Sequence, residues 1–497
     1  MRTVLAWVVA AALLLAGCAA PKETEKPPED VVIAAPAGWE QPPAPGARYV
    51  TSDDPLRELR EGRAHVAMAP GDVPDGFEGF TLAVNEWVLM QGWLDSPLAF
   101  TAAEATEQLK RVGTTRGVPA PKPGALIRGR LMEMQPGWRA IPVDGVVPTP
   151  QTVWSGEYPL SGRIVVASRP GVNPAVLDAL KRDAQQPPAP WATLSVTGDF
   201  MLARGVARAM RENGTLYPVA KVQDHLSKAD LTFVNLESPI GVKGTALPGK
   251  QIWFRAAPEA MEILKVAGVD GVTVANNHIL DYDSENFLET LDGLKQAGIA
   301  YVGGGRNIEE ARKPMVLEAK GVKIAFLGYS QFADLFFDWN YPRSFAATET
   351  IPGVPRIQED WLAEDIKAAK ALAPIVAVAF HWGDEFQNYP NSEQQRIARH
   401  TIDLGADLVL GYHPHAIQGF ELYKGKFIAY STGNFIMDRQ DTDLARESMI
   451  LDFAVGPDGV KSVGVLPVWI KAEQPYIMTG AERETLLQKM RTISGWK

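Results

Sequence analysis

From about residue 191 onward, short runs rich in apolar and β-branched residues alternate with longer segments whose apolar residues recur at helical spacing. The short runs predict strands at residues 192–197, 231–234, 272–275, 323–327, 375–380, 408–410 and 427–430. The longer segments predict helices at residues 258–267, 284–297, 357–371 and 392–404. Strands that alternate with helices in this way indicate a layered α/β fold.

The N-terminal residues show a different hydrophobic pattern, a single continuous apolar run. Arg2 precedes an apolar run over residues 5–15, which is short for a bilayer span but suits the central region of a secretory signal. Leu-Ala-Gly-Cys, ending at Cys18, resembles the bacterial lipobox, in which the cysteine becomes the lipidated first residue of the mature protein. Cys18 is the one cysteine in the chain, which excludes an intrachain disulfide. We expect a lipid anchor at Cys18 and a location on the extracytoplasmic face of the cell membrane. A plain signal peptide with an incidental cysteine remains an alternative.

Proline-rich stretches suggest the domain boundaries. We expect a lipoprotein signal peptide at residues 1–18, a flexible tether at 19–46 and a first domain at 47–184. A linker at 185–190 leads to a second domain at 191–475, and a helical C-terminal tail occupies 476–497. The formal net charge of −10 gives the chain no general attraction for nucleic acid, so no nucleic-acid partner is expected.

Polar residues directly follow the predicted strands of the second domain. In open α/β sheets, sites form beyond the carboxyl ends of the strands, so these groups are predicted to converge. The groups are Gly198-Asp199, Asn235-Leu236-Glu237, Asn276-Asn277-His278 with Asp281, His381-Trp382-Gly383-Asp384-Glu385, His413-Pro414-His415 and Gly433-Asn434.

Their chemistry favours a divalent metal site. Carboxylates, amide oxygens and imidazoles bind hard or borderline divalent ions, and the second domain has no cysteine. Four of the seven histidines lie in these groups. One or two ions are expected, and the ligand types do not distinguish Mn, Fe, Zn, Mg or Ca. Two neighbouring ions can clamp a phosphoryl or carbonyl group and activate a bridging water.

The order of these motifs over residues 191–440 resembles that of the CapA family of capsule and poly-γ-glutamate biosynthesis proteins. That family is similar in fold to calcineurin-like metallophosphoesterases, which implies a layered α/β/β/α sandwich. By this resemblance, the metal ligands are Asp199, Glu237 and His415 for the first ion and Asn277, His381 and His413 for the second, with Glu237 bridging or ligating. The resemblance further implies that His278 is an acid or orients a phosphate, with Asp281 orienting His278. Arg204 could contact an anionic substrate, and Glu385 could be a base or a supporting residue.

One position departs from the phosphoesterase pattern. That superfamily usually has Asp-x-His in its first motif, and Met201 stands where the histidine would be. One ion, or two of unequal affinity, are both consistent with this change. Purely structural roles also remain open for several of these residues. Asp199 could cap a helix, His413 and His415 could lie in a surface turn, and Arg204 and Glu385 could form structural ion pairs.

The first domain resembles one lobe of a phosphate-type periplasmic binding protein. Residues 143–150 and 155–160, which lead into a predicted strand at 164–167, carry this resemblance. A smaller α/β domain is therefore expected before the sandwich, either as a ligand lobe or as a structural or partner-binding remnant.

Taken together, the sequence predicts a surface-anchored, metal-dependent hydrolase of phosphoester or amide bonds in polymer biosynthesis. The expected partners are an anionic surface polymer or phosphoester substrate and a polymer-synthase complex. A non-catalytic polymer scaffold and a ligand-sensing lipoprotein are the alternatives.

Overall fold

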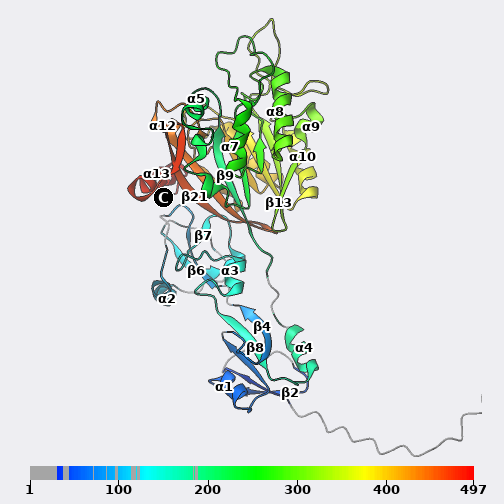
Figure 1. Cartoon of the computed structure of the whole chain (residues 1–497), viewed down its shortest axis with the longest axis vertical. Helices are drawn as coiled ribbons and strands as arrows, with labels where there is room; N and C mark the ends of the chain where they lie inside the picture. Colours follow the sequence, from blue (N-terminus) through cyan, green and yellow to red (C-terminus); the bar gives the residue numbers. More distant parts are fainter. Residues whose placement is uncertain are drawn as a thin grey trace, which may run out of the picture. The chain divides into compact units, whose positions relative to one another are not determined.

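The computed structural model describes residues 31–36, 44–70, 72–84, 87–95, 99–112, 119, 122, 124–182, 184 and 188–496. The chain divides into two compact units (Figure 1). The N-terminal unit contains residues up to Val84 and Gly162–Gln186. The main unit contains Asn85–Ser161 and Pro187–Lys497. Cys18 and the predicted signal peptide lie outside the described residues. Among the helices that the structure describes, none combines the length and apolar character needed to span a membrane.

The N-terminal unit is a small α/β domain with a five-stranded sheet in the order β2-β1-β3-β8-β4. The strands are β1 (Val31–Ala35), β2 (Ala47–Thr51), β3 (Val66–Pro70), β4 (Glu78–Val84) and β8 (Arg163–Ser168), and the helices are α1 (Pro55–Arg60) and α4 (Pro174–Arg182). The prediction of a tether over residues 19–46 is therefore wrong from residue 31. The run Val-Val-Ile-Ala-Ala is fully buried as β1, because consecutive apolar residues suit a strand covered on both faces.

The main unit is built on two sheets. The first has the order β12-β11-β10-β9-β20-β21-β22, with β19 also pairing with β9. Its strands are β9 (Ala192–Phe200), β10 (Leu231–Leu236), β11 (Gly271–Thr273), β12 (Ala300–Val302), β19 (Asn434–Ile436), β20 (Glu447–Gly456), β21 (Gly459–Lys471) and β22 (Gln474–Ile477). The second has the order β13-β14-β15-β16-β18-β17. Its strands are β13 (Met315–Ala319), β14 (Val322–Ser330), β15 (Ile375–His381), β16 (Leu408–Tyr412), β17 (Phe420–Tyr423) and β18 (Lys426–Ala429).

The two sheets pack face to face, and helices cover their outer faces (Figure 1). Phe233 of β10 stacks on Phe326 of β14 in the core between the sheets, with ring centroids 4.4 Å apart. Helices α5 (Arg204–Asn213), α7 (Met261–Val266) and α8 (Asp283–Ala297) cover the first sheet. Helices α10 (Glu359–Leu372) and α11 (Ser392–Asp403) cover the second sheet. The predicted α/β/β/α sandwich is confirmed.

Residues 85–161 belong to the main unit, which corrects the predicted domain boundaries of 47 and 184. They form a three-stranded sheet of β5 (Trp87–Gly92), β6 (Leu126–Arg130) and β7 (Trp138–Ala140), with α2 (Ala102–Arg111) and α3 (Pro150–Ser155). Trp93 follows β5 and packs edge-on against Phe427 of β18, with centroids 5.1 Å apart. The carbonyl of Leu94 accepts a hydrogen bond from Arg491 Nε at 2.8 Å. This segment completes the core between the two sheets and therefore cannot be part of an independent first domain.

The C-terminal residues also complete the main unit. Helix α13 (Gly480–Ile493) buries Leu487 and Met490 in the core between the sheets.

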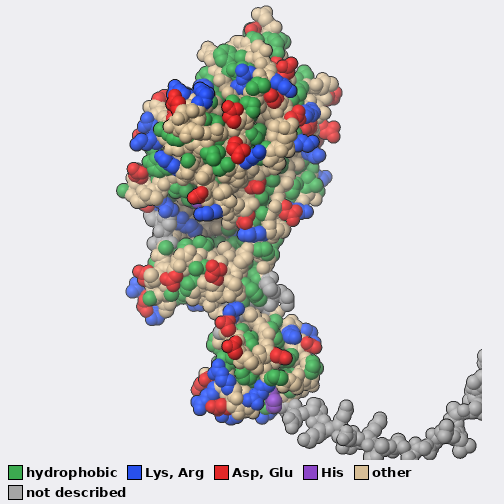
Figure 2. Space-filling model, viewed as in Figure 1, with side chains coloured by type: hydrophobic (Ala, Val, Ile, Leu, Met, Phe, Trp, Pro, Cys, Tyr) green, Lys and Arg blue, Asp and Glu red, His purple; other side chains and the backbone are tan. Residues whose placement is uncertain are grey.

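In the predicted linker, residues 188–190 have no regular secondary structure, and 185–187 lie outside the described residues. On the face of the main unit drawn in Figure 2, acidic and basic side chains are interspersed.

Candidate metal centre

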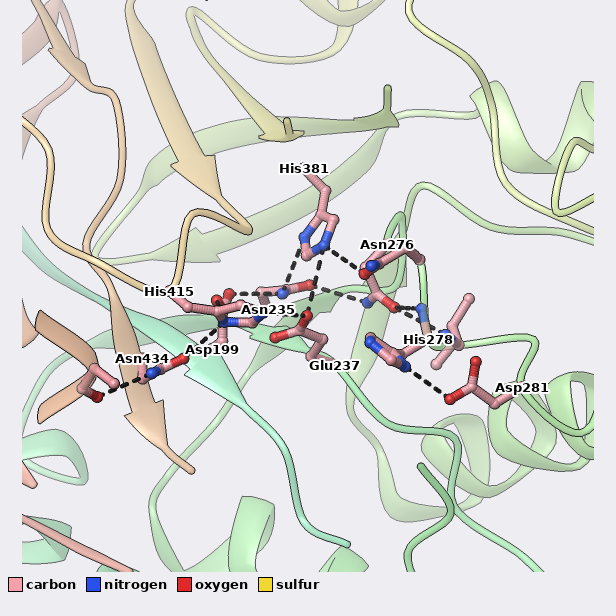
Figure 3. Close-up of polar contacts among 12 residues, drawn as sticks. Asp199, Asn235, Glu237, Asn276, His278, Asp281, His381, His415 and Asn434 are labelled. Carbon is pink, nitrogen blue, oxygen red and sulfur yellow. Dashed lines mark hydrogen bonds and ion pairs between the residues drawn. The ribbon is translucent and has the colours of Figure 1, made fainter. Parts of the chain in front are cut away.

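Residues of the polar motifs lie close together, with side chains turned toward one another (Figure 3). The first sheet contributes Asp199 from β9 and Glu237 directly after β10. The second sheet contributes His381 at the end of β15, and His413 and His415 directly after β16. Parallel pairing of β9 with β10 and of β15 with β16 brings these strand ends side by side. The convergence predicted from strand topology therefore occurs, and it spans both sheets.

Two groups of three side chains could each hold a metal ion. The first group is Asp199, Glu237 and His415, and the second is Glu237, His381 and His413. Within each group the ligand atoms lie within 4.8 Å of one another. Glu237 Oε1 is 3.6 Å from His381 Nε2 and 3.7 Å from His415 Nε2. Glu237 belongs to both groups, which is the geometry of a bridging ligand.

The buried polar atoms of this site lack the partners that protein interiors normally supply. Asp199 Oδ2, both carboxyl oxygens of Glu237 and His413 Nδ1 are buried with no hydrogen-bond partner among the described residues. Such an atom destabilises a protein by about 1–3 kcal/mol, so four of them together require an explanation. Divalent cations held by the two groups would supply partners for these side chains. The residues present therefore fit a metal centre.

Burial shapes the charge state of the histidines. Burial lowers the pKa of His381 and of His413 well below the usual value, which favours the neutral imidazole that binds metals. Burial, followed by the charge of Asp199, raises the pKa of Glu237. Burial would lower the pKa of His415, but the carboxylates of Glu237 and Asp199 raise it to about 9. Without a metal, His415 thus holds a proton that a bound cation would displace.

Asparagine side chains orient the ligands. Asn235 Nδ2 donates to Asp199 Oδ1 at 2.8 Å, and Asn276 Nδ2 donates to Asn235 Oδ1 at 3.1 Å. Asn434 Oδ1 lies 2.8 Å from His415 Nδ1, so His415 donates from Nδ1 and turns Nε2 toward Glu237. Of these three asparagines, sequence analysis gave none a ligand role, although all lie in the motifs that it singled out.

Asn277, predicted as a ligand of the second ion, lies beside the second ligand group. Its Oδ1 is 2.8 Å from His381 Nε2, the imidazole nitrogen that also faces Glu237. An amide oxygen in this position can join His381 and His413 around one ion.

His278 and Asp281 form a buried pair next to the ligands (Figure 3). His278 Nδ1 is 2.7 Å from Asp281 Oδ2, and the ring of Phe254 stacks on His278 with centroids 3.8 Å apart. Burial lowers the pKa of His278 to about 4. Lys250, which sequence analysis missed, forms a buried ion pair with Asp281. It is a single lysine in a long loop, and no local pattern distinguishes it from a surface lysine.

Arg204 and Glu385 have different surroundings from the ligands. Arg204 forms a two-pronged ion pair with Asp438 and stacks on Phe254, with its guanidinium carbon 4.5 Å from the ring centroid. Its guanidinium therefore has a structural partner, and the predicted contact with a substrate stays a prediction. Glu385 is exposed, and its charge still reaches the site because it raises the pKa of Glu237 and His415.

Met201, at the position of the expected histidine, is fully buried in the core on the helical side of the first sheet. Its Sδ accepts a hydrogen bond from the backbone N–H of Ala203 at 3.2 Å. The first group thus has three protein ligands from Asp199, Glu237 and His415, without a contribution from residue 201.

Some of the residues with a left-handed backbone lie at or near the site. Arg204, Phe386, His413 and His415 have positive φ angles of 49°, 57°, 94° and 52°. Side-chain-bearing residues rarely adopt this region, and each instance costs about 1–3 kcal/mol. A hydrogen bond of 2.7 Å from Phe386 N to the Pro414 carbonyl ties the two strained loops together. Strain of this kind is typical of functional sites.

Comparison with known proteins gives the family. A family model described as "Bacterial capsule synthesis protein PGA_cap" matches residues 193–439, the segment that carries every ligand described above. "Capsule biosynthesis protein CapA" of Bacillus anthracis is 31% identical over 296 residues, which cover 58% of this chain and 70% of that protein. "PGA biosynthesis protein CapA" of Bacillus subtilis (strain 168) is 30% identical over 297 residues, with coverages of 59% and 75%.

A solved ABC-type phosphate transport receptor from Vibrio cholerae aligns with 30% of this chain and 93% of its own, at 11% identity and a TM-score of 0.22. A score this low carries no argument, so the likeness of the first domain to a binding-protein lobe stays a prediction. The sequence matches over the main unit, at about 30% identity, are much stronger. The chain belongs to the CapA family of bacterial capsule synthesis proteins.

Proposed function

We propose that this protein is a metal-dependent hydrolase that cleaves phosphoester or amide bonds during the synthesis or processing of a surface polymer. The observation that carries the proposal is Glu237, a buried carboxylate with both oxygens unpartnered, placed between two sets of further ligands. In a purely structural site, buried carboxylate oxygens normally accept hydrogen bonds from nearby donors. The names of the relatives, capsule and PGA biosynthesis proteins, support a polymer substrate with γ-glutamyl linkages.

The residues divide into holding and proton-transfer roles. Asp199, Glu237 and His415 would hold one ion, and Asn277, His381 and His413 would join Glu237 around a second. Bound ions would polarise the scissile phosphoryl or carbonyl group and lower the pKa of water. His278, held at Nδ1 by Asp281, turns its opposite edge toward the Glu237 side of the site (Figure 3). From there Nε2 exchanges a proton with the leaving group or orients the substrate.

The proposal includes a location. Acyl chains on Cys18 would anchor the mature protein to the extracytoplasmic face of the membrane, close to a polymer-synthase complex. The full chain should partition into the detergent phase of a cloud-point extraction, and Cys18→Ser should move it to the aqueous phase. Equal partitioning of both proteins would overturn the anchor.

Metal analysis combined with a hydrolase screen tests the activity. A soluble form of the chain that begins at residue 19 and lacks Cys18 is freed of metal, reloaded with Mn, Zn, Fe, Mg or Ca in turn, and assayed on a generic phosphodiester and on γ-glutamyl oligomers. We expect at least one equivalent of bound metal and hydrolysis that His413→Ala abolishes. His400→Ala is the matched control, because His400 lies on α11 beside Glu359 and outside both ligand groups. Less than one equivalent of metal, or unchanged hydrolysis in His413→Ala, would overturn the proposal.

A second candidate is a non-catalytic scaffold that binds the polymer through its carboxylates and a metal. Met201 favours it, because the first ligand group has one fewer ligand than the phosphoesterase pattern supplies. Metal-dependent binding of γ-glutamyl oligomers without turnover of any substrate in the screen would establish the scaffold over the hydrolase.

A further inference from the structure

Lys250 occupies an unusual place beside the metal centre. It lies in the loop between β10 and η3 (Pro258–Ala260), yet only 7% of its side chain is exposed. Its Nζ forms an ion pair with Asp281 and donates to the Asn277 carbonyl at 2.5 Å. Lysine is rarely buried unless it is paired, and here the partner is the carboxylate that contacts His278.

The surroundings of Lys250 exclude water from this ion pair. Its Nζ lies 4.9 Å from the ring centroid of Phe345 and 5.3 Å from that of Phe337. Asp281 is fully buried, and its Oδ2 accepts a hydrogen bond of 2.6 Å from Phe254 N. A buried carboxylate without a counter-charge is strongly destabilising, and Lys250 supplies that counter-charge to Asp281.

The distances select one tautomer of His278. Its Nδ1 is 2.7 Å from Asp281 Oδ2 and 3.3 Å from Lys250 Nζ. An ammonium group only donates and a carboxylate only accepts, so Nδ1 cannot satisfy both with one protonation state. The shorter contact is an N–H donated to Asp281, which leaves the lone pair of the neutral ring on Nε2. That nitrogen is on the side of Glu237 in Figure 3.

We infer that Lys250 is a positioning residue which, by neutralising and holding Asp281, fixes His278 in the Nδ1–H tautomer with Nε2 available to the substrate. The consequence for catalysis rests on the proposed hydrolase function, but the tautomer itself does not. Lys250 also joins the loop after β10 to the loop after β14 through Phe337 and Phe345. A lysine with only that loop-joining role would not influence the protonation pattern of His278.

Nitrogen NMR of the metal-free soluble form from residue 19, labelled at histidine, distinguishes the two roles. Seven histidines give a small set of signals, and His278→Gln assigns the one that matters. We expect the wild type to show an Nδ1–H tautomer at His278, and Lys250→Met to show a mixture. Lys250→Arg should restore the wild-type pattern. Asp281→Asn calibrates the readout, because its amide can donate to Nδ1 and so favour Nε2–H.

The matched control is Lys461→Met. Lys461 is also a buried lysine in an ion pair, with Asp458 at 2.7 Å, but it lies on β21 and contacts none of the site residues named above. It should lower stability without changing the His278 signal. If Lys250→Met fails to fold, Lys250→Gln removes the charge while keeping a donor and makes the same prediction.

An unchanged His278 tautomer in folded Lys250→Met or Lys250→Gln would overturn the inference. In the hydrolase assay, we expect Lys250→Met to lower kcat at least tenfold with KM nearly unchanged, and Lys250→Arg to recover most of that loss. A tautomer change without hydrolysis in any variant, wild type included, would support the role of Lys250 while refuting the hydrolase.

Discussion

Replacing Glu237 with methionine should make the metal-free protein more stable and the metal-loaded protein impossible to form. Methionine has nearly the same length and reaches the same space, but it removes two buried oxygens that lack hydrogen-bond partners. The side chain is completely buried, so solvent does not compensate these atoms. The substitution therefore separates what the site contributes to folding from what it contributes to metal binding.

The structure allows the size of the effect to be worked out. Two unpartnered oxygens destabilise the native state by about 1–3 kcal/mol each. Against this gain, the variant loses the attraction between Glu237 and protonated His415, which we place at roughly 2 kcal/mol from the raised pKa of His415. The net expectation is a metal-free variant that is more stable by about 2 kcal/mol, or a rise in Tm of about 3 °C.

The assay is thermal unfolding with and without metal. At a metal concentration 100-fold above Kd, the wild type should gain about 2.7 kcal/mol, whereas Glu237→Met should gain nothing. Glu447→Met is the contrasting control. Glu447 is also buried, but it is paired with Lys489, so its loss should destabilise by about 1–2 kcal/mol after discounting for the partly exposed lysine. A metal-free Glu237→Met that melts below the wild type, or that still responds to metal, would refute this reasoning.

Three further predictions follow from the same contacts. The pKa of His415 is about 9 in the folded chain, against 6.5 when unfolded, so protonated His415 stabilises the fold fully below pH 6.5 and this effect is lost as pH rises to 9. The unfolding free energy of the metal-free protein should therefore fall by up to roughly 3 kcal/mol over that range. His415→Ala or added metal should remove this pH dependence. His413→Ala should reduce bound metal by about one equivalent by elemental analysis, since one ligand group loses a nitrogen, while secondary structure by circular dichroism stays the same. Trp93→Ala should destabilise the main unit by about 3–5 kcal/mol in denaturant unfolding, because Trp93 packs on Phe420 and Phe427. An unchanged unfolding free energy would mean that residues 85–161 are not part of this core.

The sequence predicted the site better than it predicted the chain's division into units. Strands such as 375–380 and 408–410 were foreseeable because fully buried parallel strands are continuous apolar runs that end in polar residues. The long antiparallel pair β20 and β21 was not foreseen, since the first half of β20 is buried on both faces and lacks the alternation of a half-buried strand. Its partners are set by long-range pairing with β9, which no local pattern encodes.

The missed contributions share a physical cause. Lys250 is enclosed beside the site only because Phe337 and Phe345, nearly a hundred residues later, pack against it. Trp93 belongs to the main unit only because Phe427 lies opposite it. In both cases the local sequence is that of an ordinary loop, and tertiary contacts decide the role. Motif order indicated the candidate ligands because they lie at or just after the ends of their strands, so local sequence was sufficient there.

The arrangement of the ligands has a consequence for the dynamics of the metal-free protein. Asp199 and Glu237 belong to the first sheet, whereas His381, His413 and His415 belong to the second. Without metal, the two sheets are joined at this end by hydrogen bonds such as Asn277 to His381 and Asn434 to His415. A cation coordinated from both sides would replace these contacts with a cross-link between the sheets. The strained loop that carries His413 and His415 should then gain protection from hydrogen exchange on metal binding, while β20 and β21, which pair within one sheet, should not. Equal protection of both regions would mean that metal stabilises the whole unit rather than this junction.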